Sequence, residues 1–162
     1  MEYKYIHLKT NDTSYVLAIN KYGHLENLYY GAKLALNEDL SILVNKQTNM
    51  QGTTTVYSGE PHDTYSLDFV NLELGTIGKG DYRRPSILLE HELGFASDFV
   101  VKKHGFAGRE VLLVNDLPIP HGYDEYFYVI LEDNISKVKV QLDYLIFKRA
   151  NVIAWRLVVL SG

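Results

Sequence analysis

Hydrophobic and polar residues alternate along Ser136–Phe147, and this alternation is the clearest structural pattern in the chain. Apolar side chains occupy every second position: Val138, Val140, Leu142, Tyr144 and Ile146. The positions between them are Lys137, Lys139, Gln141, Asp143 and Leu145. Because successive side chains of a β-strand point to opposite faces, the pattern predicts a strand with one buried face and one mostly solvated face. Such one-sided burial is typical of an antiparallel sheet.

Other segments rich in β-branched and aromatic residues are separated by Gly, Asn, Asp or Pro, and they also predict strands. They are Tyr3–Lys9, Ser14–Asn20, Leu25–Tyr30, Ser86–His91, Asp98–Lys103, Glu110–Val114, Glu125–Leu131 and Asn151–Leu160. A helical turn or two is expected only at Ser66–Leu74, with Ser66 as the N-cap. We therefore predict an all-β fold, an antiparallel β-sandwich or supersandwich with little helix. The long polar stretch Asn45–Pro61 predicts an irregular loop of the kind that often carries function.

The composition fits one β-rich domain. A chain of 162 residues is long enough to bury about two-thirds of the surface that its unfolded form exposes. Cysteine is absent, which excludes disulfides and thiolate chemistry. The 13 tyrosines suit strands, whose faces accept an aromatic ring with its hydroxyl in water. Tyrosine rings also stack on sugars, so carbohydrate binding stays open beside this structural interpretation.

Charge and the N-terminal residues limit the expected partners. The chain has 16 basic and 20 acidic residues, a formal charge of −4, and no large basic cluster, which argues against a nucleic-acid partner. The first residues, Met1–Tyr5, lack the basic and apolar regions of a signal peptide. No stretch approaches the ~20 apolar residues of a membrane span. We expect a cytoplasmic protein with no membrane association.

The sequence carries no motif of a catalytic or cofactor site. The histidines form no HxH or HExxH pair, so we expect no metal; they are His7, His24, His62, His91, His104 and His121. Gly75–Gly80 has its glycines in the wrong order for a phosphate-binding loop and predicts a turn. There is no GxSxG elbow. We therefore assign no catalytic residue and no cofactor.

Carboxylates are plentiful, but a general acid/base pair is defined by a separation in space that sequence does not give. We interpret each of the candidates as a solvated turn residue. They are Asp81, Asp98, Asp124, Glu125, Glu132, Asp133 and Asp143.

The segment Gly78–Pro85 combines flexible, charged and rigid residues between two apolar segments. A glycine-rich bend followed by proline can hold side chains in a fixed pose, so Asp81, Tyr82 and Arg83 are candidates for a substrate rim or an interface. Arg83 could pair bidentately with a carboxylate of a neighbouring chain or with Asp81 itself. In the second case the pair would only pin the loop.

Several motifs in order resemble the N-terminal β-sandwich domain of glycoside hydrolase family 36 α-galactosidases. Gly23–Gly31 is similar to the family's Gly-x-Leu-x-x-Leu-Tyr-Tyr-Gly segment, and Gly78–Pro85 resembles its Tyr-Gly-x-Gly-Asp-Phe-Arg-x-Pro segment. Ser97–Phe99 looks like its Ser/Thr-Asp-Phe motif. The C-terminal part, Leu131–Arg156, resembles its Leu-x-Asp … Leu-x-Tyr … Val-Ile-x-Arg pattern. Each motif is unspecific alone, and their order carries the resemblance.

The resemblance implies a β-supersandwich that precedes a (β/α)₈ barrel in the whole enzyme. In that family the two catalytic aspartates of the retaining mechanism lie in the barrel, so none of the carboxylates here takes their roles. The resemblance also implies that residues 1–162 correspond to the first half of the sandwich domain. The whole enzyme would hydrolyse terminal α-linked galactose in melibiose- or raffinose-type sugars, and this segment would support homo-oligomer assembly and the rim of the active site.

One departure from the family pattern affects the expected substrate contacts. Many members carry a Pro-Arg-Leu-Asp-Arg segment whose Asp reaches the galactose site, whereas the corresponding residues here, Leu43–Met50, contain no Asp. Two other functions stay open: a stand-alone carbohydrate-binding, lectin-like sandwich, and an interaction module without a ligand. Trp155, a possible stacking platform, lies in an apolar segment and is expected in the core.

Overall fold

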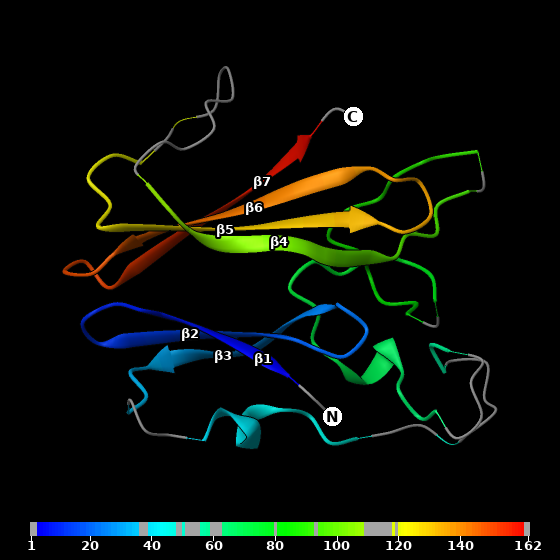
Figure 1. Ribbon diagram of the computed structural model, residues 1–162, viewed down its shortest axis with the longest axis horizontal. Helices are drawn as coiled ribbons and strands as arrows, with labels where there is room; N and C mark the ends of the chain where they lie inside the picture. The colour runs from blue at the N-terminus through cyan, green and yellow to red at the C-terminus, as the bar shows by residue number, and fades with distance from the viewer. Residues whose placement is uncertain are drawn as a thin grey trace.

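The computed structural model contains two antiparallel sheets stacked face to face (Figure 1). It describes residues 3–35, 39–47, 50, 56–58, 63–79, 81–92, 94–108, 118 and 120–160. The first sheet has the order β1 (Lys4–Lys9), β2 (Thr13–Ile19) and β3 (Leu25–Ala32). The second has the order β4 (Phe99–Ala107), β5 (Glu125–Asp133), β6 (Lys139–Phe147) and β7 (Val152–Leu160). The prediction of an all-β sandwich with little helix is confirmed.

Between the sheets lies one apolar core formed by the inward-facing residues of both. The first sheet contributes Ile6, Leu8, Leu17 and Leu25, and the second contributes Phe99, Phe127, Val129, Leu131, Val140, Leu142, Tyr144 and Ile146. The alternation along β6 therefore placed its apolar residues on the correct face. Burying them against the other sheet supplies the main driving force for the fold.

The expectation that the other face of β6 is solvated was wrong. Gln141, Asp143 and Leu145 on that face are also buried, and Asp143 has no exposed surface. The Asp143 carboxylate accepts hydrogen bonds from the Tyr126 hydroxyl at 2.8 Å and from the Gln141 amide at 2.8 Å. It also accepts one from the Arg156 Nε at 2.7 Å. Since β6 itself and both neighbouring strands supply these donors, the outer face of β6 is covered by a polar network that no periodicity reveals.

Trp155 was expected in the core, yet it is 45% exposed. It lies on β7 directly opposite Tyr144 of β6, so both side chains project from the same face of the sheet. Tyr144 is fully buried. The three-stranded first sheet covers β6 but does not fully cover β7, which leaves Trp155 and Val159 partly exposed on an inner face.

Other expected elements differ from the structure. The turn near Ser66 is only the short 3₁₀ helix η2 (Leu67–Phe69), and the Ser66 side chain forms no cap hydrogen bond. A second 3₁₀ helix, η1 (Leu40–Leu43), begins after Asp39, whose carboxylate accepts from the Ser41 N–H. Ser86–His91 forms no strand, and only an isolated bridge joins His91 to Gly94. The predicted strand Glu110–Val114 lies outside the described residues.

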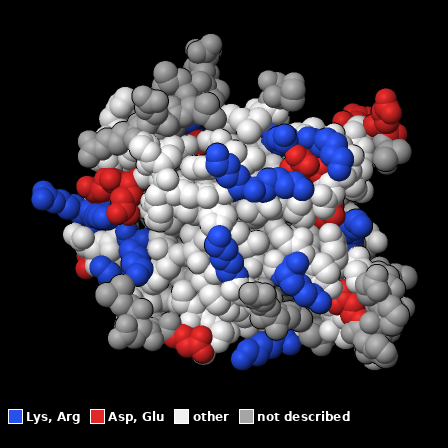
Figure 2. Space-filling model, viewed as in Figure 1, with Lys and Arg blue, Asp and Glu red and all other residues white. Residues whose placement is uncertain are grey.

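Polar contacts join the two sheets at both ends of the sandwich. At one end the Asn151 side chain accepts hydrogen bonds from the Thr10 hydroxyl at 3.0 Å and from the Asp12 N–H at 2.9 Å. At the other end the segment after η2 runs between the layers and leads into β4 (Figure 1). On the face seen in Figure 2, acidic and basic side chains are scattered among uncharged ones.

Candidate functional site

The turn between β2 and β3 presses against β4 of the opposite sheet. Gly23 has φ +88°, a conformation that L side chains rarely adopt, and a Cβ on it would lie 3.3 Å from the Val100 Cβ. Its carbonyl accepts a hydrogen bond from the Val101 N–H at 2.8 Å. Glycine is therefore required here both for its conformation and for this close approach. His24, the next residue, therefore lies at the boundary between the two sheets.

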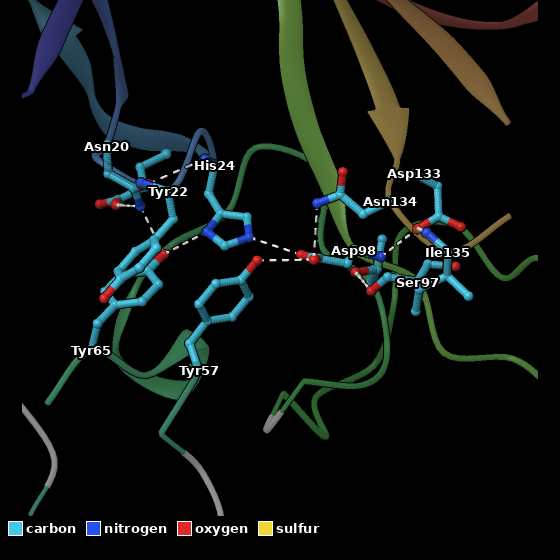
Figure 3. Close-up of polar contacts among 12 residues, drawn as sticks. Asn20, Tyr22, His24, Tyr57, Tyr65, Ser97, Asp98, Asp133, Asn134 and Ile135 are labelled. Carbon is cyan, nitrogen blue, oxygen red and sulfur yellow. Dashed lines mark hydrogen bonds and ion pairs between the residues drawn. The ribbon is translucent and has the colours of Figure 1, made fainter. Parts of the chain in front are cut away.

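His24 is 2% exposed and has a partner at each ring nitrogen (Figure 3). Its Nε2 lies 3.0 Å from Asp98 Oδ1, and its Nδ1 lies 3.0 Å from the Tyr65 hydroxyl oxygen. An ionised carboxylate only accepts, so Nε2–H donates to Asp98. The Tyr65 oxygen in turn accepts from the Asn20 amide at 2.7 Å.

Asp98 is 3% exposed and is held by three side chains. Besides His24, the Tyr57 hydroxyl donates to its Oδ2 at 2.9 Å and the Asn134 amide at 3.1 Å. Burial raises the pKa of Asp98, but hydrogen bonds from His24, Asn134 and Tyr57 outweigh burial and hold the pKa below its ordinary value. The carboxylate is therefore ionised at neutral pH.

A second buried aspartate, Asp133, extends this arrangement to the end of β5. The Asp98 N–H donates to Asp133 Oδ1 at 2.6 Å, while the Ser136 N–H and hydroxyl donate to Oδ2 at 2.9 and 2.5 Å. Burial raises the pKa of Asp133, but the bonds from Ser136 and from the backbone lower it below its ordinary value. The two carboxylates thus connect the start of β4 to the turn after β5 (Figure 3).

Aromatic rings enclose His24 on the side of the first sheet. The Tyr22 ring lies 4.7 Å from that of Tyr65 and 4.9 Å from that of Tyr57, between ring centroids. The Tyr22 hydroxyl donates to Asp63. Burial raises the pKa of Asp63, but bonds from Ser58 and Tyr22 outweigh it and lower the pKa to about 2. We call the set formed by these contacts the His24 cluster: Asn20, Tyr22, His24, Tyr57, Asp63, Tyr65, Asp98 and Asp133.

The His24 cluster has the groups of an acid/base site, but these groups are buried. A void of about 10 Å³ lies beside His24 and Asp98. That is room for about one water molecule, whereas ligand pockets have volumes of about 300–1,000 Å³. With both ring nitrogens of His24 occupied and its imidazole buried, the cluster fixes loops to the two sheets.

The structure places the predicted residues Asp81, Tyr82 and Arg83 on a separate loop. Asp81 is 2% exposed, and Arg83 donates to its two oxygens from Nε at 2.9 Å and from Nη2 at 2.8 Å. The same Nη2 donates to the carbonyls of Leu67 and Val70 at 2.8 and 2.9 Å. Of the two pairings left open by the sequence, the structure therefore contains the one within the chain. Tyr82 is 74% exposed, and nothing in the described residues tests a rim or interface role for these three.

The interpretation of the carboxylates as solvated turn residues was wrong for the buried ones. These are Asp81, Asp98, Asp133 and Asp143. Each carboxylate accepts several hydrogen bonds, which is what allows an acidic group to be buried. The described residues contain no group of three or more His, Asp or Glu arranged to hold a metal ion, and His62 lies outside them. No helix in the described part of the chain is long and apolar enough to cross a membrane.

Sequence reasoning missed His24, Tyr57 and Tyr65 as members of one site. The motif segments Gly23–Gly31 and Ser97–Phe99 did contain His24 and Asp98, so ordered motifs were the available signal. The pairing itself joins residues 74 positions apart, and no local pattern predicts such a contact.

Comparison with known proteins gives one consistent match. The glycosyl hydrolase family 36 N-terminal domain matches residues 23–161. A bifunctional alpha-galactosidase/sucrose kinase, AgaSK, of Mediterraneibacter gnavus is 28% identical over 150 residues, which make up 90% of this chain and 16% of that protein. Alpha-galactosidase 1 of Pediococcus pentosaceus is 26% identical over 154 residues, 91% of this chain and 20% of that protein. The chain thus spans about a fifth or less of these relatives.

Solved structures share the fold described above. The galactosidase domain of AgaSK has a TM-score of 0.78 and 27% identity, covering 95% of this chain and 21% of that one. The α-galactosidase AgaA of Geobacillus stearothermophilus has a TM-score of 0.79 and 25% identity over the same shares. A variant of AgaA, 24% identical and with a TM-score of 0.79, was crystallised in complex with raffinose.

Proposed function

Because this chain belongs to the glycosyl hydrolase family 36 N-terminal domain family, we propose that it is the non-catalytic β-sandwich segment of an α-galactosidase. The whole enzyme would hydrolyse terminal α-linked galactose in melibiose- or raffinose-type sugars. The match over residues 23–161 carries this proposal, since matched relatives are α-galactosidases of which this chain spans about a fifth. The His24 cluster supports a scaffolding role, because its buried, paired side chains join the first sheet to the second.

We further propose that residues 1–162 are the first half of a larger sandwich domain. The inner face of β7 supports this, because Trp155 and Val159 project from the same face as the buried Tyr144 and Val140 but are 45% and 53% exposed. An apolar inner face beyond the edge of the covering sheet is suited to further strands or to a second copy of the chain.

Two contributions to the whole enzyme follow. The segment would support homo-oligomer assembly, and the loop with Tyr82 and Arg83 would lie at the rim of the active site or at an interface. The role of the loop at a rim or interface is supported by the way the loop is held. Asp81 is buried, and Arg83 is bound to three groups of the same chain. Tyr82 is thereby presented outward on a fixed support.

A chimera tests the proposal. The segment of the Mediterraneibacter gnavus relative that matches this chain would be deleted, or replaced by this chain, and hydrolysis of a chromogenic α-galactoside would be measured. We expect the deletion to abolish hydrolysis and the chimera to restore it, because the sandwich supports the rest of the enzyme. A chimera carrying Tyr144→Ala serves as the control and should fail. Full hydrolysis by the deletion variant would contradict the proposal.

A further inference from the structure

The inner face of the sandwich is partly exposed beside β7. In the first sheet, residues 71–73 run along the outer edge of β3, where the Glu73 N–H donates to the Leu25 carbonyl at 2.9 Å. In the second sheet, β7 is the last strand in the order and pairs with β6. The Tyr144 hydroxyl of β6 donates to the Glu73 carboxylate at 2.8 Å. Glu73 therefore joins the two sheets near the strand whose inner face is exposed.

Aromatic rings from both sheets line this part of the inner face. Tyr30 of β3 lies opposite Tyr15 of β2, so both project from the same face, and their ring centroids are 5.5 Å apart. Tyr15 in turn lies 6.0 Å from Tyr144, which is the neighbour of Trp155 on β7. Tyr30 is 60% exposed and Trp155 is 45% exposed. The two sheets therefore both present ring surface that a further segment could cover.

Neutral groups hold the Glu73 carboxylate beside these rings. The hydroxyls of Tyr15 and Tyr144 and the amide of Asn27 donate to it, at 2.7, 2.8 and 2.8 Å. None of the ion pairs between described residues includes Glu73. Burial raises the pKa of Glu73, and the hydrogen bonds that the carboxylate accepts do not offset it. A positive charge brought next to this carboxyl group would stabilise its ionised form.

The chemistry of this surface favours a cationic side chain over other occupants. The electron-rich faces of aromatic rings attract cations, Trp most strongly. The carboxylate of Glu73 adds a negative charge, which would repel an acidic side chain, while an apolar side chain would bury the carboxylate further without a charged partner. Arginine suits both features, because its planar guanidinium group can stack on the Trp155 ring and donate two hydrogen bonds to a carboxylate.

We propose that a β-strand carrying an arginine covers the inner face of β7, and that its guanidinium group stacks on Trp155 and pairs with Glu73. The strand would pair along the edge of β7 that faces away from β6, and its apolar side chains would cover Val159, which is 53% exposed. The inference rests on the proposed function, since the remainder of the larger sandwich would supply this strand. It adds the charge of the residue that the strand must place beside Glu73.

The fluorescence of Trp155, the single tryptophan of the chain, provides a direct test. The isolated chain is titrated at pH 7 with the peptide acetyl-Thr-Val-Arg-Val-Thr-amide. A matched peptide carries citrulline in place of arginine, which keeps the shape of the side chain and removes its charge. We expect the arginine peptide to bind about tenfold more tightly, because only its side chain is a cation that can stack on Trp155 and pair with Glu73.

Two further measurements assign the preference to Glu73. Glu73→Gln removes the charge and keeps the shape, so it should bind both peptides equally, whereas Glu90→Gln, at an exposed carboxyl group, should keep the preference. NMR of the carboxyl carbons in the unmodified chain requires no variant to fold. The pKa of Glu73 should fall when the arginine peptide binds and should not fall with the citrulline peptide.

The proposal is overturned if the unmodified chain binds the two peptides equally or binds neither. It is also overturned if Glu73→Gln keeps the preference for arginine, or if the arginine peptide leaves the pKa of Glu73 unchanged. All these measurements follow binding to the isolated chain. Their failure is therefore distinguishable from failure of the proposed function, which hydrolysis by the chimera decides.

Discussion

Two carboxyl groups, Glu73 in the core between the sheets and Asp98 in the His24 cluster, have pKa values shifted in opposite directions. Glu73 accepts hydrogen bonds from the hydroxyls of Tyr15 and Tyr144, at 2.7 and 2.8 Å, and from the Asn27 amide at 2.8 Å. Burial nevertheless dominates and raises its pKa. Asp98 also accepts from a tyrosine and an asparagine, yet its pKa is lowered.

The difference between the two regions lies in what surrounds each group. Glu73 lies beside Tyr15 and Tyr144, whose rings are 6.0 Å apart between centroids, and burial outweighs its hydrogen bonds. Asp98 lies at the start of a strand, where the imidazole N–H of His24 and a polar turn stabilise its charge. Hydrogen bonds therefore favour the ionised form of both groups, but burial outweighs them at Glu73 and does not at Asp98.

Truncating an apolar side chain of the core near Glu73 should have the largest effect on the free energy of unfolding. Leu142→Ala deletes a side chain with no exposed surface, so we expect the free energy of unfolding to fall by about 2–5 kcal/mol. Lys139→Ala, on the same strand with its side chain 51% exposed, should change it by less than about 0.5 kcal/mol. Urea midpoints measure both, and equal shifts would contradict the location of the core.

Breaking the His24 cluster should have a smaller effect that depends on pH. Asp98→Asn should lower the free energy of unfolding by about 1–3 kcal/mol at pH 7, because the donors around a buried carboxylate lose their partner. Since the folded pKa of Asp98 is below its ordinary 3.8, its contribution is present above that value and is lost as pH falls through the folded pKa. Urea unfolding of both proteins at pH 7 and at pH 3 measures this. Glu90→Gln, on an exposed side chain, is the control, and an Asp98→Asn effect that grows on acidification would contradict the assignment.

The core residues on β6 could be predicted from the sequence, whereas the His24 cluster could not. Alternation along β6 predicts Leu142 and Tyr144 as core because apolar burial repeats with the period of the strand. Asp98 and Asp143 were interpreted as solvated because no local pattern shows the donors, His24 and Arg156, that other strands bring to them. The prediction that Trp155 lies in the core was wrong for a related reason. Its burial depends on how far the opposite sheet extends over β7, which the sequence of β7 does not show.

Neutralising the core carboxyl should show the opposite pH dependence. The folded pKa of Glu73 is above its ordinary 4.5, so its favourable contribution is present below 4.5 and is lost as pH rises through the folded pKa. Glu73→Gln cannot ionise, and its free energy of unfolding should therefore rise relative to the unmodified chain between pH 4 and pH 7. Unfolding in urea across this range measures the difference. A difference that shrinks as pH rises would mean that burial does not dominate at Glu73.

An exposed position outside both regions should have the smallest effect on stability. Tyr82 is 74% exposed, so Tyr82→Ala should change the free energy of unfolding by less than about 0.5 kcal/mol. If the loop forms an interface, the same variant should shift the sedimentation of the chain toward smaller species across a concentration series. A large loss of stability with unchanged sedimentation would assign Tyr82 to the folding of the loop instead.

Hydrolysis of a chromogenic α-galactoside by the isolated chain tests most directly whether its buried carboxylates serve structure rather than catalysis. We expect no turnover above a matched blank, because Asp81 and Asp98 are buried and paired within the chain. Turnover that survives repurification and is lost in Asp98→Asn or Asp81→Asn would contradict it.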